Sequence, residues 1–227
     1  MKIIEPSIEI LTPQEELDNI LTKIERAART CYKSEDKIAD GSAARLVKFL
    51  INANHEAMLE HASIAVKFTC DRGVSHELVR HRMASYAQES TRYCNYTSED
   101  KFNGELTFIK PHWIKKSVKE LVEGSYNEGD IDKNEFAYLV LCNDVEDDYR
   151  RLVKSNGLTL QDARGCLNHW VKTEVVMTAN IREWRHFFKL RTAKDAHPDM
   201  RRIALMALKE LKARVPVIFD DIEIEEN

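Results

Sequence analysis

The sequence predicts an α+β fold, in which helices pack around a mainly antiparallel sheet. Helix-like and strand-like segments alternate loosely along the 227 residues, without the regular βαβ spacing of a parallel sheet. The composition, 43% hydrophobic and 32% charged, is that of an ordinary globular chain long enough to bury a core. We therefore expect one domain over residues 1–219, followed by an acidic, solvated tail over 220–227.

Hydrophobic spacing in the N-terminal half predicts a strand-like start, two helices and a longer strand. The opening MKIIEPSIEI is apolar and β-leaning, and Thr12-Pro13 then begins a helix that reaches Tyr32. A second amphipathic helix is expected over 46–54. From Ala62 to Cys70, apolar side chains alternate with smaller or polar ones, which predicts a strand with one buried face. Asp71 is placed to cap the helix that follows.

The C-terminal half predicts a short strand at 106–109, a long helix through 138–152 that Gly157 ends, a short helix over 160–167 and a strand over 170–178. Asn180 then caps a helix. Its inward-facing residues are Ile181, Trp184 and Phe188, and those that face elsewhere are Arg182, Arg185, His186 and Lys189. Pro198 begins a last helix. We expect the aromatic residues of the capped helix to be core residues, because their spacing suits burial.

Charge and cysteine content narrow the function classes. The formal net charge of -4 argues against general nucleic-acid binding, although basic segments at 80–92 and 182–202 suit small anionic ligands. No apolar run approaches 18 residues and the N-terminus has no export leader, so we expect no membrane insertion and a cytoplasmic protein. The five cysteines are scattered and include no Cys-x-x-Cys pair, which indicates reduced thiols.

The segment RHRMASYAQESTR concentrates anion-binding groups. It holds Arg80, His81 and Arg82, then Ser90, Thr91 and Arg92, on a stretch that we expect to be a loop. Guanidinium groups and short hydroxyls suit phosphate and carboxylate oxygens. If the preceding helix continued through this motif, its two outer arginines would project about 200° apart. They therefore serve different groups, or the helix ends there.

Other catalytic patterns are missing from the sequence. There is neither a G-x-G-x-x-G fingerprint after a strand nor a G-x-x-x-x-G-K-[ST] loop, so a dinucleotide would not be held in the Rossmann manner. His55 and His61 are six residues apart, instead of the four that would place both on one helix face. We therefore expect no metal site. A G-x-S-x-G serine elbow and an activated cysteine are also lacking.

The ordered sequence blocks resemble the flavin-dependent thymidylate synthase family. Beside Arg-His-Arg and the serine ten residues after its first arginine, the matching blocks are ERAARTCY, NHEAMLEH, ARGCLN, TANIREWRHFFKLR and AHPDMR. The resemblance implies a homotetramer with FAD at its subunit contacts. It also implies that dUMP is methylated to dTMP, with methylenetetrahydrofolate as carbon donor and NADPH as the source of the FAD-relayed hydride. No side chain acts as a covalent nucleophile, and the cofactor carries the difficult chemistry.

The resemblance also assigns residues. Flavin positions are Ala57, Arg80, His81, Arg82, Gln88, Asn180, Arg182 and His186. The dUMP positions are Glu77, Arg80, Gln88, Ser90, Thr91, Arg92, Arg164 and Arg191. Arg191 matches the residue that polarises the uracil ring, which makes it the expected catalytic residue. Three positions depart from the common family residue, namely Glu77, Gln88 and His186. The carboxylate of Glu77 would accept from the uracil ring or from an arginine, and roles for His55 and Glu60 stay open.

Two other readings of the same residues remain. A non-enzymatic nucleotide or RNA-binding module would use the basic segments at 80–92 and 182–202. A metal-dependent phosphohydrolase would use His55, His61, His76 and His81. The first predicts steep salt dependence of binding, and the second predicts stoichiometric metal after dialysis.

Overall fold

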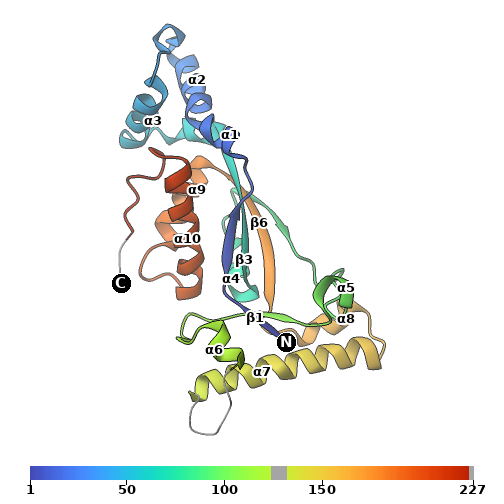
Figure 1. Ribbon diagram of the computed structural model, residues 1–227. Helices are drawn as coiled ribbons and strands as arrows, with labels where there is room; N and C mark the ends of the chain where they lie inside the picture. The colour runs from blue at the N-terminus through green and yellow to red at the C-terminus, as the bar shows by residue number, and fades with distance from the viewer. Residues whose placement is uncertain (124–131, 225–227) are drawn as a thin grey trace. The chain divides into compact units, whose positions relative to one another are not determined.

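Helices and strands alternate along residues 1–123 and 132–224, which are the residues that the computed structural model describes (Figure 1). The chain forms two compact units, each assembled from separate stretches. The first unit comprises Met1–Pro6, Thr69–His76 and Gln88–Val175, and the second comprises Ser7–Phe68, Glu77–Ala87 and Val176–Asn227. Strands β3 (Ser63–Asp71) and β6 (Lys172–Asn180) contribute residues to both.

The strands form two sheets. One has four strands in the order β2 (Ser7–Ile10), β3, β6 and β4 (Ala84–Gln88). The other pairs β1 (Lys2–Ile4) with β5 (Thr107–Ile109) in parallel, with Ile3 opposite Phe108. The predicted mixture of helices and sheet is confirmed, whereas the mainly antiparallel arrangement of the larger sheet stays a prediction.

The first unit is organised around the long helix α7 (Lys133–Arg150), which continues into the π turn η3 (Arg151–Ser155). Its other short helices are α5 (Glu99–Phe102), α6 (Val118–Glu123), α8 (Leu160–Ala163) and η4 (Arg164–Cys166). Tyr138 and Tyr149 of α7 are buried beside Phe108 and Tyr96 in one apolar cluster. The Tyr138 hydroxyl donates to the Ile109 carbonyl at 2.9 Å, so α7 is tied to the small sheet.

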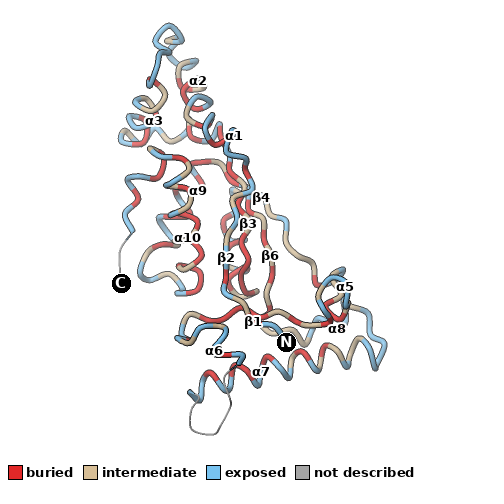
Figure 2. Tube along the Cα trace, viewed as in Figure 1, coloured by how far each residue is buried: buried red, intermediate tan, exposed pale blue. Residues whose placement is uncertain are grey.

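The second unit holds the remaining helices apart from α4 (Arg72–Leu78), which is divided between the two units. These are α1 (Gln14–Asp18), α2 (Ile20–Tyr32), η1 (Glu35–Lys37), α3 (Ser42–Asn52), η2 (Glu56–His61), α9 (Ile181–Arg191) and α10 (Pro198–Arg214). Trp184, Phe187 and Phe188 of α9 are fully buried, as expected. Figure 2 colours the buried stretches of this helix and of its neighbours red. The Trp184 indole donates to the Ile64 carbonyl at 3.0 Å. This bond fixes α9 to β3 and thereby sets the direction of its polar side chains.

Local signals placed several element boundaries correctly. Asp71 accepts from the Val74 amide at 2.8 Å at the start of α4 (Arg72–Leu78), and Asn180 accepts from the Glu183 amide at 2.8 Å. The expected first helix is instead two helices that meet at Asn19. The Asn19 side chain donates to the Glu15 carbonyl at 2.8 Å, and such side-chain bonds compete with the helical ladder.

The structure corrects three expectations. Residues 84–88 were expected in a loop and form β4, because they pair with β6 at the end of the larger sheet. Arg185 was expected to face away from the core but is 2% exposed. The tail was expected to be solvated, yet Asp221 is bonded to Arg185 at 2.6 Å and Ile222 is buried. Residues 225–227 of the tail lie outside the described residues.

Candidate functional site

The Arg-His-Arg motif forms a turn directly after α4. The helix ends at Leu78, and the amides of Arg80 and His81 donate back to the carbonyls of Glu77 and Leu78 at 3.2 and 3.1 Å. Of the two alternatives that the sequence left open, the helix therefore ends, just before this motif. His81 is buried with 5% exposure, whereas Arg80 and Arg82 are exposed. The turn thus separates one inward imidazole from two outward guanidiniums.

Tyr86 of β4 holds this turn in place. Its hydroxyl lies 2.7 Å from the Leu78 carbonyl oxygen and 2.8 Å from that of His81, so one hydrogen is shared between two acceptors. Burial is the main cause that raises the Tyr86 pKa to about 12, with a further contribution from Glu183. The hydroxyl therefore stays protonated and remains a donor at neutral pH.

Arg191, the expected catalytic residue, lies beside the turn although it is 110 residues from His81 in sequence. Its Nε donates to His81 Nε2 at 3.0 Å, and its Nη1 donates to Glu77 Oε2 at 2.9 Å. The Glu77 carboxylate thus accepts from an arginine, which is one of the two roles that the sequence left open for it. The Arg191 side chain is 22% exposed, so it is held by the protein and is not fully enclosed.

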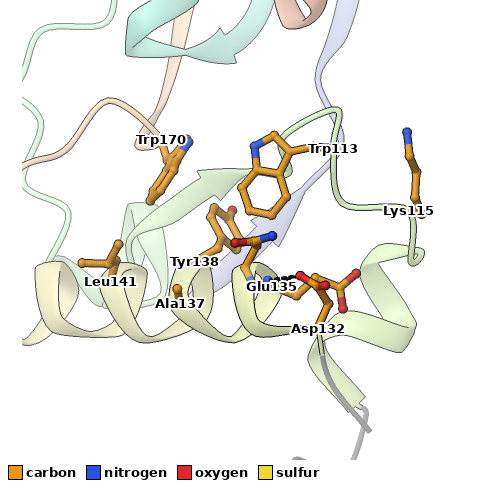
Figure 3. Close-up of a pocket in the computed structure, with 9 residues that line it drawn as sticks. Trp113, Lys115, Asp132, Glu135, Ala137, Tyr138, Leu141 and Trp170 are labelled. Atoms are coloured by element: carbon orange, nitrogen blue, oxygen red, sulfur yellow. Dashed lines mark hydrogen bonds between the residues drawn. The ribbon is translucent and has the colours of Figure 1, made fainter.

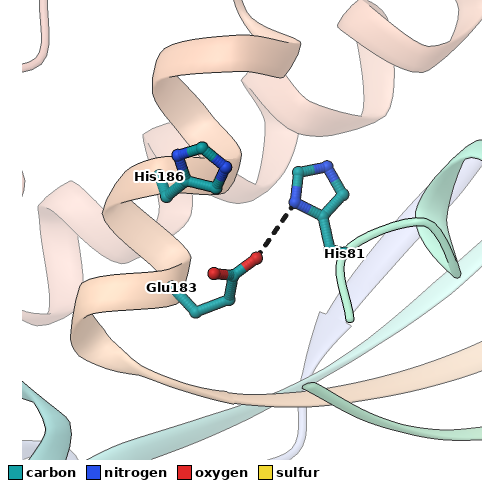
Figure 4. A group of neighbouring side chains, drawn as sticks. All are labelled: His81, Glu183 and His186. Atoms are coloured by element: carbon teal, nitrogen blue, oxygen red, sulfur yellow. Dashed lines mark hydrogen bonds and ion pairs between the residues drawn. The ribbon is translucent and has the colours of Figure 1, made fainter. Parts of the chain in front are cut away.

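His81 links Arg191 to Glu183. His81 Nδ1 lies 3.1 Å from Glu183 Oε1 (Figure 4). An arginine nitrogen can only donate, so Nε2 of His81 accepts and Nδ1 carries the hydrogen that Glu183 accepts. Burial, followed by the positive charge of Arg191, lowers the pKa of His81, and the bond to Glu183 opposes part of that shift. His81 is therefore neutral at pH 7.

His81, Glu183 and His186 also form a group that could in principle hold a metal ion. One ligand atom from each lies within 4.8 Å of the others, and Figure 4 shows the three side chains facing one space. A metal needs a lone pair from each nitrogen ligand, and Nδ1 of His81 carries a hydrogen while Nε2 accepts from Arg191. The observed bonds therefore oppose metal binding. His55, His61 and His76 do not belong to this group.

A polar pocket of about 360 Å³ lies beside the carboxylate of Glu183. Its lining residues are Glu56, Glu60, Met83, Asn180, Arg182, Glu183, His186 and Lys189. Arg182 Nη1 donates to Glu60 at 2.7 Å, and Glu56 lies 3.6 Å from Arg182 Nε. Asn180, Arg182 and His186 are three of the expected flavin positions, and the pocket brings them together. Its cationic side chains already face carboxylates.

Arg80 and Arg82 differ from Arg182 in their bonding. Within residues 1–123 and 132–224, their guanidinium groups make no hydrogen bond or ion pair. Ala57, another expected flavin position, is exposed in η2. The second unit therefore contains every expected flavin position except Gln88, together with Glu77 and Arg191.

Gln88 belongs to the first unit, where its amide is already bonded. Gln88 Nε2 donates to the hydroxyl oxygens of Ser75 and Thr173 at 3.0 and 3.2 Å. Both hydroxyl residues are fully buried. The amide nitrogen is thus tied to the protein, which leaves the carbonyl oxygen as the group that a ligand can reach.

The other expected dUMP positions also lie in the first unit. Ser90 begins a turn in which its hydroxyl accepts from the Arg92 amide at 3.3 Å. Thr91 is buried, whereas Arg92 and Arg164 are exposed and their guanidiniums make no hydrogen bond or ion pair among the described residues. Arg92 lies over the Tyr93 ring at 5.5 Å. These residues offer two guanidiniums that have no carboxylate partner among the described residues.

A second pocket, of about 540 Å³, was not anticipated from the sequence (Figure 3). Trp113, Tyr138 and Trp170 give it aromatic walls, and Figure 3 shows the two indoles above α7 with Tyr138 between them. Asp132 caps α7 by accepting from the Asn134 amide at 2.8 Å. The pocket is therefore part of the scaffold around the start of α7, and none of the expected site residues lines it.

Sequence reasoning missed Glu183 and Tyr86. Glu183 occupies the third position of α9, where an acidic residue is common for reasons of capping and dipole alone. Tyr86 was placed in a loop, so no bond to the motif was expected. Both residues act on His81, and only the folded arrangement reveals that connection.

Comparison with solved structures places the fold. A crystal structure of thymidylate synthase X from Helicobacter pylori, with FAD and dUMP, superimposes with a TM-score of 0.70 at 20% identity, over 95% of this chain and 98% of that one. The UMP/dUMP methylase PolB from Streptomyces cacaoi, bound with 5-Br dUMP, gives a TM-score of 0.72 at 21% identity, over 97% and 96%. The architecture is thus that of a class of folds found in pyrimidine nucleotide methylases.

Sequence comparison then defines the family. The family model described as thymidylate synthase complementing protein matches residues 15–217. A flavin-dependent thymidylate synthase from Mycolicibacterium vanbaalenii is 34% identical over 210 residues, which cover 88% of this chain and 79% of that protein. Another, from Corynebacterium efficiens, is 30% identical over 89% and 79%. The chain belongs to the family of flavin-dependent thymidylate synthases.

The described helices of residues 1–123 and 132–224 are all too short or too polar to cross a membrane.

Proposed function

We propose that this protein is a flavin-dependent thymidylate synthase that converts dUMP to dTMP. The observation that carries the proposal is the bonding of Arg191 to the Arg-His-Arg turn, through His81 at 3.0 Å. Two of the sequence blocks that define the resemblance thereby meet in one unit. The reaction is inferred from family membership. The structure adds that the Arg191 guanidinium is hydrogen-bonded to His81 and Glu77 while its side chain is partly exposed.

FAD carries negatively charged phosphates and a polar ring system. The second unit offers cationic and polar side chains that suit both. Arg80 and Arg82 are uncommitted cations on one turn, and Asn180, Arg182 and His186 line or adjoin the polar pocket. When bound, FAD would supply the hydride that completes the new methyl group, after methylenetetrahydrofolate has provided its carbon and NADPH the reducing equivalents. Guanidinium and amide donors would hold its phosphate and carbonyl oxygens.

Arg191 would act on the pyrimidine. A fixed cation beside a uracil carbonyl stabilises negative charge on the ring, which makes its carbon more nucleophilic. The hydrogen on that carbon would leave as a proton when the methyl group is complete. Arg92 and Arg164 would neutralise the phosphate of dUMP, because a guanidinium matches the geometry of phosphate oxygens. Ser90 and Thr91 would add hydroxyl and amide donors, and Gln88 its free carbonyl oxygen.

The proposal extends to the assembly. Expected ligand positions are divided between the two units, so residues 1–219 would work as one catalytic domain. A homotetramer with FAD at its subunit contacts, and a cytoplasmic location, are further proposals that follow from the family resemblance. Analytical ultracentrifugation of the purified protein with FAD would test the tetramer.

The experiment that tests the function is optical and isotopic. The purified protein should show an oxidised-flavin absorption band, and NADPH should bleach it under anaerobic conditions. With methylenetetrahydrofolate, the protein should release tritium from the uracil ring of labelled dUMP. A protein that stays colourless with excess FAD and releases no tritium would contradict the proposal. A steep loss of polyanion binding with salt would instead support the RNA-binding alternative.

A further inference from the structure

Helix capping does not explain why the Glu183 side chain is buried. The Asn180 side chain already caps α9 by accepting from the backbone amide of Glu183 at 2.8 Å. The Glu183 carboxylate is therefore not needed for the cap, yet it is only 9% exposed. Its Oε1 contacts His81 Nδ1, 102 residues away in sequence. Because Asn180 caps the helix and Glu183 contacts His81, we look for the function of this carboxylate in its effect on the imidazole.

The hydrogen-bond directions along this chain follow from the chemistry of its members. A neutral imidazole has one donor nitrogen and one acceptor nitrogen, and the bond at one nitrogen decides the state of the other. A carboxylate at Nδ1 favours the hydrogen on Nδ1, which leaves a lone pair on Nε2. That lone pair faces the Nε hydrogen of Arg191 at 3.0 Å. The carboxylate thus determines whether the arginine finds an acceptor.

The opposite tautomer would face Arg191 with a hydrogen. Two N–H groups would then oppose each other across 3.0 Å, and the guanidinium would have to rotate or withdraw. Its remaining contacts are to Glu77, at 2.9 Å to the carboxylate and 3.4 Å to the carbonyl. Those contacts engage Nη1 and Nη2 and leave Nε without an acceptor.

We propose that Glu183 is a positioning residue that orients Arg191 through His81, by holding the imidazole as its Nδ1–H tautomer. In this role Glu183 acts on Arg191 only through the His81 ring. The inference rests on the proposed function of Arg191 as the cation beside uracil. It also explains why three groups with metal-ligand chemistry can lie together while their bonds oppose a metal.

Glu183→Gln is the direct test, because glutamine has nearly the same shape and can also donate to Nδ1. Nitrogen-15 NMR of histidine-labelled protein, with His81 assigned by a His81→Gln variant, reports the tautomer. Wild-type protein should show a protonated Nδ1, and Glu183→Gln should shift the population toward protonated Nε2. We expect kcat to fall roughly 10- to 100-fold, as when a group that orients a histidine is lost, while FAD occupancy is unchanged.

Glu210→Gln is the matched control. It removes one carboxylate from an i,i+4 pair with Arg214 on α10, and it should leave the tautomer and kcat unchanged. Retention of the Nδ1–H tautomer and full kcat in Glu183→Gln would overturn the positioning role. If that variant does not fold, a protonated Nε2 in the wild-type protein would overturn it equally. Absence of dTMP formation by the wild-type protein would overturn the proposed function, whereas the tautomer measurement is independent of it.

Discussion

Arg185 and Asp221 form a two-bond ion pair that ties α9 to the segment after α10. Arg185 Nη1 donates to Oδ1 at 2.7 Å and Nη2 donates to Oδ2 at 2.6 Å, and Arg185 also donates to the Ile218 carbonyl. The arginine is 2% exposed, whereas the Asp221 side chain is 45% exposed. An inward cation on α9 is therefore satisfied by the start of the C-terminal tail.

Asp221→Asn should destabilise the second unit. It removes the charge that accepts two Arg185 hydrogen bonds and leaves the Glu56 carboxylate, 4.0 Å from Arg185 Nε, as an anion beside this buried guanidinium. We expect a loss of about 2 kcal/mol in the free energy of unfolding, below the usual cost because the aspartate is partly exposed. The Arg185 bond lowers the pKa of Asp221, so its contribution is present above the unfolded pKa near 3.9 and is lost as pH falls. Urea unfolding at pH 7 and pH 3 measures both effects. The difference between wild type and variant should shrink at pH 3, and Glu223→Gln, an exposed carboxylate nearby, should change neither value.

Arg191→Ala should separate catalysis from flavin binding. It removes the proposed charge beside uracil and leaves Arg80, Arg82 and Arg182 in place. We expect dTMP formation to fall by roughly 100-fold or more, as for loss of a group that stabilises developing charge, with flavin absorbance nearly unchanged. Parallel loss of flavin and activity would remove Arg191 from the catalytic role.

Acid should inactivate the enzyme through His81. The groups around its bond to Arg191 are Glu77, Tyr86, Glu183, His186 and Arg191 itself. Burial and Arg191 hold the pKa of His81 below its ordinary value, so the neutral ring is retained at pH 7 and lost only as pH falls through that lowered pKa. A protonated ring no longer accepts from Arg191. The pH profile of kcat should therefore decline only at pH values below the ordinary histidine pKa of about 6.5, and a decline that sets in above that pH would contradict this assignment.

Glu60→Gln should strengthen FAD binding. Glu60 accepts from Arg182 at 2.7 Å, so a ligand that uses this guanidinium must first displace the carboxylate. Both side chains are about half exposed, so solvent screens the pair and the carboxylate is readily displaced. We therefore expect FAD affinity to rise by about two- to fivefold, measured by quenching of flavin fluorescence. Glu9→Gln, which breaks a different exposed pair with Lys67, is the control, and weaker FAD binding by Glu60→Gln would show that Glu60 supports the site.

Features encoded within a few residues were predictable from the sequence. The caps at Asp71 and Asn180 depend on residues three positions away, and the buried face of β3 follows its alternating pattern. The aromatic core of α9 was likewise predictable from its spacing. Such signals are local, so one sequence contains them in full.

Features that depend on distant partners were not predictable. Residues 84–88 become a strand because β6, far along the chain, pairs with them. Arg185 is buried because Asp221, 36 residues later, accepts its hydrogen bonds. The bond between His81 and Glu183 has no local signature at all, since either residue alone suits an ordinary surface. The assigned roles of the ligand positions remain predictions that rest on the family resemblance.

The two-sided use of Arg191 restricts what can replace it. A guanidinium offers its Nε edge to an imidazole and keeps further donors for a neighbour, whereas a lysine ammonium has no comparable fork. Lysine at this position would keep the positive charge but would lose the hydrogen bond that Arg191 Nε donates to His81. We therefore expect related proteins that lack a histidine at position 81 to differ at position 191 as well. Another group would then have to hold the cation.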